Sequence, residues 1–554
     1  MRIARVAANW QSPLLIAVFL FMFSMTAVPE AQAQGFKVTR LNPGGSVAAY
    51  ATGVNSKVQV VGAYTDSASL VHGFEWTGGT YKTINFPKAN KYTRALGIND
   101  SGEIVGDFFG SDSFYHGYTD IGGKLVQYDV DKGVVSTSIF AVNSKGDFAG
   151  AAGAQGFVNI GGTVTEFYGI GTDSTYALGI NTSDESVGQY YDSSNNSHGF
   201  YRNAAGVITE IIFPGALQTA CTGIDDSGEI VGWYVNSSGQ YYGFTDVSGV
   251  FQSNDFIFVG GVNKAGTLVG AYYGPGATGA QEYGILAIPA TFSLITVTVP
   301  KAEGTSTIAV NNAGNMVGWY TNATGVQHGM ILSGTKVTNI DDPNEIAVGN
   351  TYPEGINTSK QIVGYYLNSA NQDQAFLYSS KKFTDIGPAD AVFSVAQNIN
   401  DAGEIMGYYG DSGGGIHAFL DNAGTYTTID VPGAQYTYGW GINATGKMTL
   451  EWYDANDIFE SSTYDGTTFT TIDVPGALET SAHAINASGN VVFVWVDYYG
   501  NDHGALLNVG SYYVFDDAPG SQLRADGIND TNLIVGRFNP PGTTFFNSFK
   551  GTLK

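Results

Sequence analysis

The sequence predicts an all-β protein built from twelve copies of one small unit, and three observations support that prediction. A motif made of an apolar run, an asparagine and a glycine turn recurs along the chain at a period near 43 residues. The composition is that of a turn-rich β protein, with 75 glycines, 13% aromatic residues and only 13% charged residues. Each unit contains four short strand-like segments. A repeat of this length must be recognised before any other inference, because it decides the fold class.

The repeated motif is clearest at residues 95–108, which read Ala-Leu-Gly-Ile-Asn-Asp-Ser-Gly-Glu-Ile-Val-Gly-Asp-Phe. Its turn residues adopt positive φ or bond their own backbone between two apolar runs, which predicts a tight β-hairpin. The asparagine of this motif, once replaced by aspartate, stands at Asn55, Asn99, Asn143, Asn181, Asp225, Asn263, Asn311, Asn357, Asn400, Asn443, Asn486 and Asn529.

The four segments of one repeat predict a propeller blade. In the second repeat they are residues 93–98, 103–109, 115–120 and 125–130, joined by short turns, and a longer link leads to the next repeat. Four antiparallel strands with this connectivity are typical of a β-propeller, and a stacked β-solenoid is the alternative. The first segment holds mostly Gly, Ala, Ile and Asn, which suits the innermost strand. Acidic groups of any axial site are therefore expected to come from loops.

The two ends of the repeat array predict a closed structure. Residues 36–41 look like a fourth strand without a repeat of its own, and the last repeat stops after its third strand at residues 547–552. Because a borrowed terminal strand can complete a blade, no open edge need remain. We expect two six-bladed rings, residues 34–289 and 290–554, in which the first strand closes blade six and the fourth strand of repeat six closes blade twelve. Seven plus five blades is the alternative.

The N-terminus predicts export. Arg2 and Arg5 precede an apolar run at residues 14–23, and small residues at Ala31 and Ala33 fit a signal-peptidase site, so residues 1–33 read as a signal peptide cleaved after Ala33. An uncleaved anchor would need a longer apolar span. The protein is thus expected to be secreted, with the periplasm or the cell surface as alternatives. The single cysteine, Cys221, can form no internal disulfide and is expected to be a buried apolar residue.

The charge and the recurring polar residues exclude several classes of function. A net charge of −25 argues against nucleic acid and, after signal cleavage, against a membrane as partners. The asparagine turns are too short for calcium loops and are predicted to be Asx turns. Six histidines occupy one position in the third strand, where each is expected to tie that strand to its neighbours: His72, His116, His198, His328, His417 and His503. His483 lies outside this register. The sequence predicts no metal site, no cofactor and no catalytic residue.

A resemblance to a known family rests on these repeats. The pattern Gly-Ile-Asn-x-x-Gly-x-(Ile/Val)-Val-Gly-x-Tyr, the tripeptide at residues 417–419 (His-Ala-Phe) and the recurrent Thr-Ile-Asp-Val-Pro-Gly-Ala together resemble the bacterial extracellular HAF repeat family. The resemblance covers almost all of residues 35–554. It implies an exported β-propeller-like protein, and it supplies no agreed activity and no catalytic residues to transfer.

The candidate binding residues lie where the repeat breaks. Two repeats lack the glycine of the second strand, and there Glu451 and Trp452, and Trp495 and Asp497, place aromatic and acidic groups at comparable positions. Aromatic faces beside carboxylates suit a sugar ring. Core packing is the alternative for these residues, as it is for Trp233 and Trp319 in regular repeats.

Three hypotheses for function follow from the sequence. The first is a secreted, non-catalytic propeller whose loop faces bind a glycan, a protein or cell-surface material. The second is an extracellular carbohydrate-active hydrolase or lyase with an active site in the axial funnel, which a carboxylate pair about 5–10 Å apart would favour. The third is a structural surface protein without a ligand. The ligand, the face used and the oligomeric state are not encoded in any recognisable motif.

Overall fold

A computed structural model describes residues 31–130, 135–171, 174–254, 258–276, 279–347, 349–455, 458–474, 477–497, 500–515, 522–539 and 547–553. Within these ranges the chain forms 47 β-strands, so the predicted all-β class is confirmed. The described part of the chain contains no helix long and apolar enough to cross a membrane. The predicted signal peptide, apart from its last three residues, lies outside the described residues.

Five separate four-stranded antiparallel sheets follow one another between residues 46 and 254, each with its strands in chain order. Their strands are β2 (Ser46–Val54), β3 (Val60–Asp66), β4 (Val71–Thr77) and β5 (Thr80–Ile84); β6 (Thr93–Ile98), β7 (Ile104–Phe109), β8 (Tyr115–Ile121) and β9 (Lys124–Tyr128); β10 (Thr137–Val142), β11 (Phe148–Ala152), β12 (Gln155–Ile160) and β13 (Thr163–Phe167); β14 (Ser174–Ile180), β15 (Ser186–Tyr191), β16 (Ser197–Arg202) and β17 (Ile208–Ile211); and β18 (Gln218–Ile224), β19 (Ile230–Val235), β20 (Tyr241–Val247) and β21 (Val250–Asn254).

The second half of the chain repeats this pattern. Its strands are β25 (Ala302–Val310), β26 (Met316–Asn322), β27 (Gln327–Ser333) and β28 (Lys336–Asn339); β29 (Thr351–Ile356), β30 (Ile362–Leu367), β31 (Asp373–Ser379) and β32 (Lys382–Asp385); β33 (Phe393–Ile399), β34 (Ile405–Gly410), β35 (Ile416–Asn422) and β36 (Thr425–Ile429); β37 (Ala434–Ile442), β38 (Met448–Asp454), β39 (Phe459–Tyr464) and β40 (Phe469–Ile472); β41 (Glu479–Ile485), β42 (Val491–Val496), β43 (Asp502–Asn508) and β44 (Ser511–Phe515); and β45 (Gln522–Ile528), β46 (Ile534–Asn539) and β47 (Asn547–Leu553).

The two halves exchange strands at their junction. The innermost strand there is β22 (Phe258–Val262), which pairs with β23 (Leu268–Gly276), and β23 pairs with the first part of the long strand β24 (Gly279–Val297). The N-terminal strand β1 (Ala31–Leu41) adds to β24 as the fourth strand, and it also pairs with β44. The last part of β24 pairs with β47 as the fourth strand of the final sheet. Residue 290, the predicted domain boundary, therefore lies inside a strand that both halves share.

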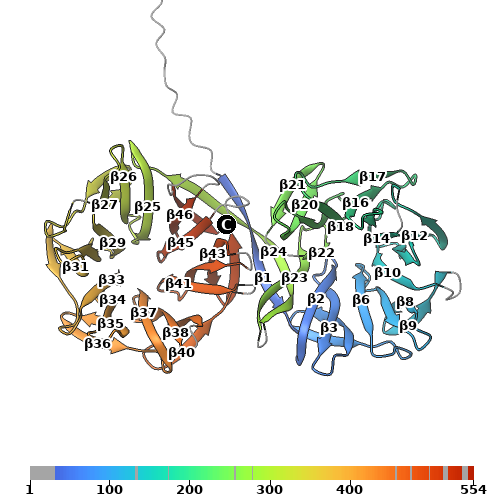
Figure 1. Ribbon diagram of the computed structural model, residues 1–554, viewed down its shortest axis with the longest axis horizontal. Helices are drawn as coiled ribbons and strands as arrows, with labels where there is room; N and C mark the ends of the chain where they lie inside the picture. The colour runs from blue at the N-terminus through green and yellow to red at the C-terminus, as the bar shows by residue number, and fades with distance from the viewer. Residues whose placement is uncertain are drawn as a thin grey trace, which may run out of the picture.

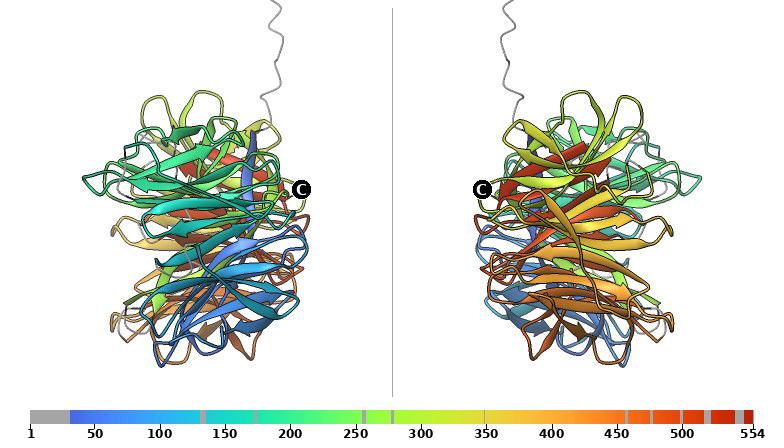
Figure 2. Two further views of the ribbon diagram at one scale, coloured as in Figure 1. Left: turned by 90° about the vertical axis from the view of Figure 1, so that its right-hand side faces the viewer. Right: turned by 90° about the vertical axis from the view of Figure 1, so that its left-hand side faces the viewer.

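The sheets are arranged like the blades of a propeller. Figure 1 shows them in two rounded groups side by side, with β1 and β24 running between the groups. In the end views of Figure 2, the sheets of the nearer group lie one above another with successive changes of tilt. The second strand of each sheet contacts the first strand of the next, as β3 contacts β6 and β30 contacts β33. The first sheet of each group also contacts the last, through β2 and β22 and through β25 and β46.

A series of asparagine side chains joins the innermost strands at one end of each group. Each Nδ2 donates to the backbone carbonyl of the equivalent residue in the next repeat, at 2.9–3.2 Å. In the second half this series is closed: Asn311, Asn357, Asn400, Asn443, Asn486 and Asn529 follow one another, and Asn529 donates back to Asn311. In the first half the series runs from Asn263 through Asn55, Asn99, Asn143 and Asn181 to Asp225.

The same asparagines shape their own turns. The Oδ1 of Asn99 accepts hydrogen bonds from the backbone N–H groups of Ser101 and Glu103, at 3.1 and 3.0 Å. This is the predicted Asx turn, and the equivalent bonds recur in the other repeats. Because the innermost strands of neighbouring sheets approach so closely, only small residues fit where two of these strands meet. A Cβ added at Gly355 would lie 2.8 Å from the Cα of Asn398 on the next strand.

In most sheets a glycine on the second strand stands opposite a large side chain on the third strand, most often phenylalanine. Gly62 on β3 pairs with Phe74 on β4, and a Cβ at Gly62 would lie 2.8 Å from the phenylalanine ring and 2.1 Å from the carbonyl oxygen of Tyr50. In the two repeats without this glycine, the large side chain stands on the second strand and the small one on the third strand. Leu450 stands opposite Ser462, and Phe493 stands opposite Ala505. The breaks in the repeat therefore have a packing explanation.

The histidines and the cysteine occupy the places that the sequence predicted. His116 on β8 bridges Asp129 through Nδ1, at 2.8 Å, and Asp112 through Nε2, at 3.0 Å. His417 has the same kind of partners in Asp430 and Asp411. Cys221 is fully buried, and burial raises the pKa of its thiol well above the ordinary value.

Replacing Asp225 by asparagine should stabilise the protein. Asp225 forms the same turn as the asparagines, because its Oδ1 accepts from the backbone of Ser227 and Glu229, but a carboxylate has no N–H for the next carbonyl. Asp225→Asn adds that donor, and we expect the free energy of unfolding in urea to rise by about 1 kcal/mol. The reverse change, Asn443→Asp, should lower it by about 1–3 kcal/mol. A loss of stability in Asp225→Asn would contradict this account of the asparagine series.

Candidate functional site

A β-bulge in every innermost strand directs one residue away from the pairing pattern, three positions before the turn asparagine. On β29, for example, Pro353 pairs with Gly364 and Gly355 pairs with Val363, which leaves Glu354 as the extra residue. Bulges of this kind re-aim a side chain and are frequent beside functional sites. The bulged residues are Thr52, Leu96, Phe140, Leu178, Thr222 and Gly260 in the first half, and Ile308, Glu354, Gln397, Trp440, His483 and Asp526 in the second half.

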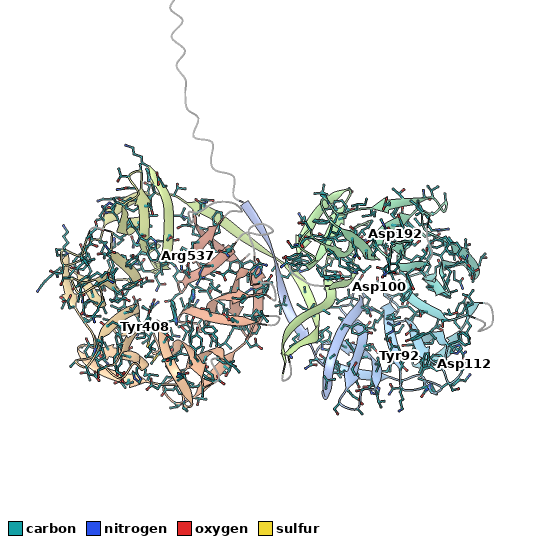
Figure 3. The ribbon with its side chains drawn as sticks, in the orientation of Figure 1. Tyr92, Asp100, Asp112, Asp192, Tyr408 and Arg537 are labelled. Atoms are coloured by element: carbon teal, nitrogen blue, oxygen red, sulfur yellow. The ribbon has the colours of Figure 1, made fainter. Side chains whose placement is uncertain are left out.

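All six bulged residues of the second half line one axial pocket of about 350 Å³. A second layer of the wall comes from residues on the first and second strands of the sheets, among which Tyr352 stands opposite Tyr365 and Arg524 stands opposite Arg537. Its aromatic members are Trp319, Tyr352, Tyr365 and Tyr408, and its cationic members are Arg524 and Arg537. Arg537 and Tyr408, labelled in Figure 3, lie in the interior of the left-hand group of sheets. The volume and the aromatic walls are those of a small-molecule site.

Glu354 is the least compensated group in this pocket. Its side chain is 8% exposed and makes no hydrogen bond or ion pair with any other described residue. Burial raises the pKa of the Glu354 carboxyl to about 8, an effect that nearby Asp526 increases and that Arg537 opposes. Glu354 is therefore protonated at neutral pH and can donate a hydrogen bond to a ligand.

Asp526 is the opposite case, because its charge is matched. Its carboxylate lies 3.3 Å from Nε of Arg537 and 3.3 Å from Nδ1 of His483. Although burial opposes ionisation, Arg537 and His483 hold the pKa of Asp526 below its ordinary value. The pocket thus contains one protonated and one ionised carboxyl at neutral pH, the separation that general acid and base roles require.

His483 connects the pocket to a chain of hydrogen bonds behind its wall. Its ring stacks on Trp440 with centroids 4.7 Å apart, and its Nε2 lies 2.9 Å from the hydroxyl of Ser481. That hydroxyl donates to Glu451, which is buried on β38. Burial raises the pKa of Glu451, with His483 and Ser481 acting in the other direction. These groups form a continuous path along which a proton can move.

The structure separates the four residues that the sequence proposed for binding. Glu451 lies behind the wall of the pocket, 4.0 Å from His483, and does not line the pocket itself. Trp452 is on the other face of β38, where its Nε1 donates to Ser462 at 3.1 Å. Trp495 is buried in the hydrophobic core and stacks on His503 at 4.4 Å. Asp497 is buried beyond the end of β42, where it accepts hydrogen bonds from Asn501.

Two sequence-based expectations are wrong. Acidic groups were expected only from loops, yet Glu354 and Asp526 lie on the innermost strands β29 and β45, because a bulge frees one position of each strand from the demand for small residues. Trp319 was expected only to pack between sheets, yet it lines the pocket. A signal was present: the residue three before each turn asparagine is polar or aromatic in five of the last six repeats.

Comparisons with known proteins give no family for this chain. No protein-family model matches it, and no curated protein matches it. Among solved structures it is similar to the SapL1 lectin in complex with α-methyl fucoside, at 12% identity and a TM-score of 0.32 over 46% of this chain and 97% of the lectin. It is also similar to a gluconolactonase from Xanthomonas campestris, at 10% identity and a TM-score of 0.30 over 48% and 90%. The BP39L lectin from Burkholderia pseudomallei matches at 10% identity and a TM-score of 0.26 over 61% and 95%. Likeness at these TM-scores decides neither the fold nor the activity.

Glu354 should make the stability of the protein depend on pH. Its pKa is about 8 in the folded chain, against an ordinary value of 4.5, so its stabilising contribution is fully present below pH 4.5 and is lost as the pH rises through 8. Glu354→Gln removes this dependence. Between pH 4 and pH 10, the unfolding free energy of the wild type should fall by roughly 2–5 kcal/mol relative to that of the variant. Urea unfolding at several pH values measures this, and parallel curves for both proteins would refute it.

Proposed function

We propose that the protein is a secreted double β-propeller with two six-bladed rings, residues 34–289 and 290–554, that binds a glycan in the axial pocket of the second ring. The observation that carries this proposal is the pocket itself, in which aromatic faces surround buried hydrogen-bonding groups. The closed asparagine series and the strand exchange at β24 support the two-ring arrangement. The leader pattern and the repeated His-Ala-Phe and His-Gly-Phe tripeptides support export and membership of the HAF repeat class.

The chemistry of the pocket suits a sugar ring. Trp440 and Trp319 bring aromatic rings to the pocket wall, and such rings suit the C–H side of a pyranose. Glu354, Gln397 and Asp526 offer donors and acceptors for its hydroxyl groups, and all three are held on strands rather than on loops. The equivalent bulged positions of the first ring are apolar, hydroxyl-bearing or glycine. We therefore place the glycan site in the second ring, and the axial pocket replaces the loop faces as the binding surface.

Removing one aromatic wall should abolish binding. Trp440 is a bulged residue whose indole lines the pocket, whereas Trp452 lies on the other face of the next strand. On a glycan array, Trp440→Ala should lose at least about tenfold in affinity, since one stacked ring contributes more than 1 kcal/mol, while the matched change Trp452→Ala should leave binding unchanged. Equal losses in both variants would place the site elsewhere. Binding of protein or cell-surface material alone would reject the glycan.

A carbohydrate-active hydrolase or lyase is the second candidate, and the carboxyl pair of the pocket favours it. A protonated Glu354 and an ionised Asp526 in one buried cavity are the groups that glycoside cleavage uses as acid and base. If the protein is an enzyme, reducing ends should appear when it is incubated with a polysaccharide that it binds. Glu354→Gln should then reduce the rate by about 100-fold or more while binding remains. Binding without any cleavage would reject this candidate.

A further inference from the structure

A pair of arginines forms an unusual part of the pocket wall. Arg524 on β45 and Arg537 on β46 are directly opposite one another in the antiparallel pairing, and both line the cavity. Like charges directly opposite each other destabilise a sheet. The whole chain contains only seven arginines and has a net charge of −25, so two adjacent arginines in one buried pocket are not explained by composition.

One repeat of the first half shows how an arginine is accommodated at this place. The equivalent pair there is Arg94 on β6 opposite Asp107 on β7. Nε of Arg94 donates to Asp107 Oδ1 at 2.9 Å, and its Nη2 donates to Oδ2 at 2.5 Å, so the guanidinium and the carboxylate match each other. An arginine at this position thus has a carboxylate partner in the opposite residue. In the second half, an arginine takes the place of that carboxylate.

Arg524 is held in position by a neighbour that leaves one of its buried donors without a partner among the described residues. Nη1 of Arg524 donates to Asp502 at 2.8 Å, while its Nε is buried without a hydrogen-bond partner among the described residues. The Arg537 guanidinium lies 5.6 Å from the centre of the Trp319 ring, a contact that orients it. Buried donors of this kind require a partner, and the planar guanidinium fork fits a carboxylate.

From this geometry we infer that the ligand of the pocket is an acidic sugar. The carboxylate of this sugar accepts hydrogen bonds from Arg524 and Arg537, as the Asp107 carboxylate does from Arg94. The inference rests on the proposed function and names its ligand class. The sugar ring then lies against Trp440 and Trp319, and its carboxylate supplies an acceptor for the buried Nε of Arg524.

The two acidic residues of the pocket are compatible with an anionic ligand. Asp526 is already matched by Arg537 and His483. Glu354 is faced by Tyr352, Tyr365 and Tyr408, whose pKa values burial raises, and by the charges of Arg537 and Asp526. A protonated Glu354 does not repel the sugar carboxylate, whereas an ionised one does. The preference for an acidic sugar should therefore weaken as the pH rises through about 8.

The test compares uronate-containing trisaccharides with their carboxyl-reduced, neutral counterparts by calorimetry on the full chain. At pH 6 the acidic sugar should bind at least about tenfold more tightly. Arg524→Gln and Arg537→Gln should each bring the two sugars to nearly equal affinity, and Arg537→Lys should retain part of the preference. Arg94→Gln, the matched change in the first half, should leave both affinities unchanged.

The outcomes separate this inference from the proposed function. Equal binding of acidic and neutral sugars by the wild type, or equal losses in Arg94→Gln, would overturn the acidic-sugar inference and leave glycan binding intact. Binding of neither sugar, with no glycan bound on the array, would overturn both. If an arginine variant unfolds, the wild type still decides the question. Its preference for the acidic sugar must decrease when the salt concentration rises from about 0.1 to about 0.5 M. A constant preference would reject the ion pair.

Discussion

The structure depends on one interaction, the hydrogen bond from an asparagine side chain to the carbonyl of the equivalent residue in the next repeat. The Oδ1 of the same residue organises its own turn, so one side chain sets both the hairpin and the spacing between neighbouring innermost strands. That spacing explains why a Cβ at Gly355 would collide with the next strand. It also brings residues that are about 43 positions apart in the sequence around a common axis.

The repeat separates positions that serve packing from positions that are free to vary. The glycine of the second strand serves packing. Where a larger residue replaces it, the residue opposite is small, as with Leu450 opposite Ser462 and Phe493 opposite Ala505. The bulged residue is free to vary, since no cross-strand partner constrains it. The first half of the chain uses these bulged positions for small, apolar or hydroxyl-bearing residues. The second half places Glu354, Gln397, Trp440, His483 and Asp526 there.

The pocket also shows how a low dielectric assigns different states to chemically similar groups. Glu354 and Asp526 are both buried carboxyls on equivalent bulges, yet the pKa of one is raised and that of the other is lowered. The difference lies in their neighbours, because Asp526 contacts Arg537 and His483, whereas Glu354 is buried beside three tyrosines without an ion-pair partner. Arg524 and Arg537, which pair with Asp502 and Asp526, place two guanidinium groups in the pocket of a strongly acidic protein.

The sequence by itself determined the repeated four-stranded unit, the all-β class, the Asx turns, the structural role of the histidines and the burial of Cys221, because these follow from local patterns with a fixed period. It also indicated that residues 36–41 add to another repeat, since a lone strand must find a partner. Only the tertiary structure decided the site. Glu451 lies behind the wall of the axial pocket, in contact with His483, whereas Trp452 and Trp495 bond and pack elsewhere, because neighbouring residues on a strand point to opposite faces. The bulge that turns Glu354 and Asp526 toward the axis shifts this alternation by one residue, and the pairing of Arg524 with Arg537 depends on strand register. Neither can be read from residue order without the backbone.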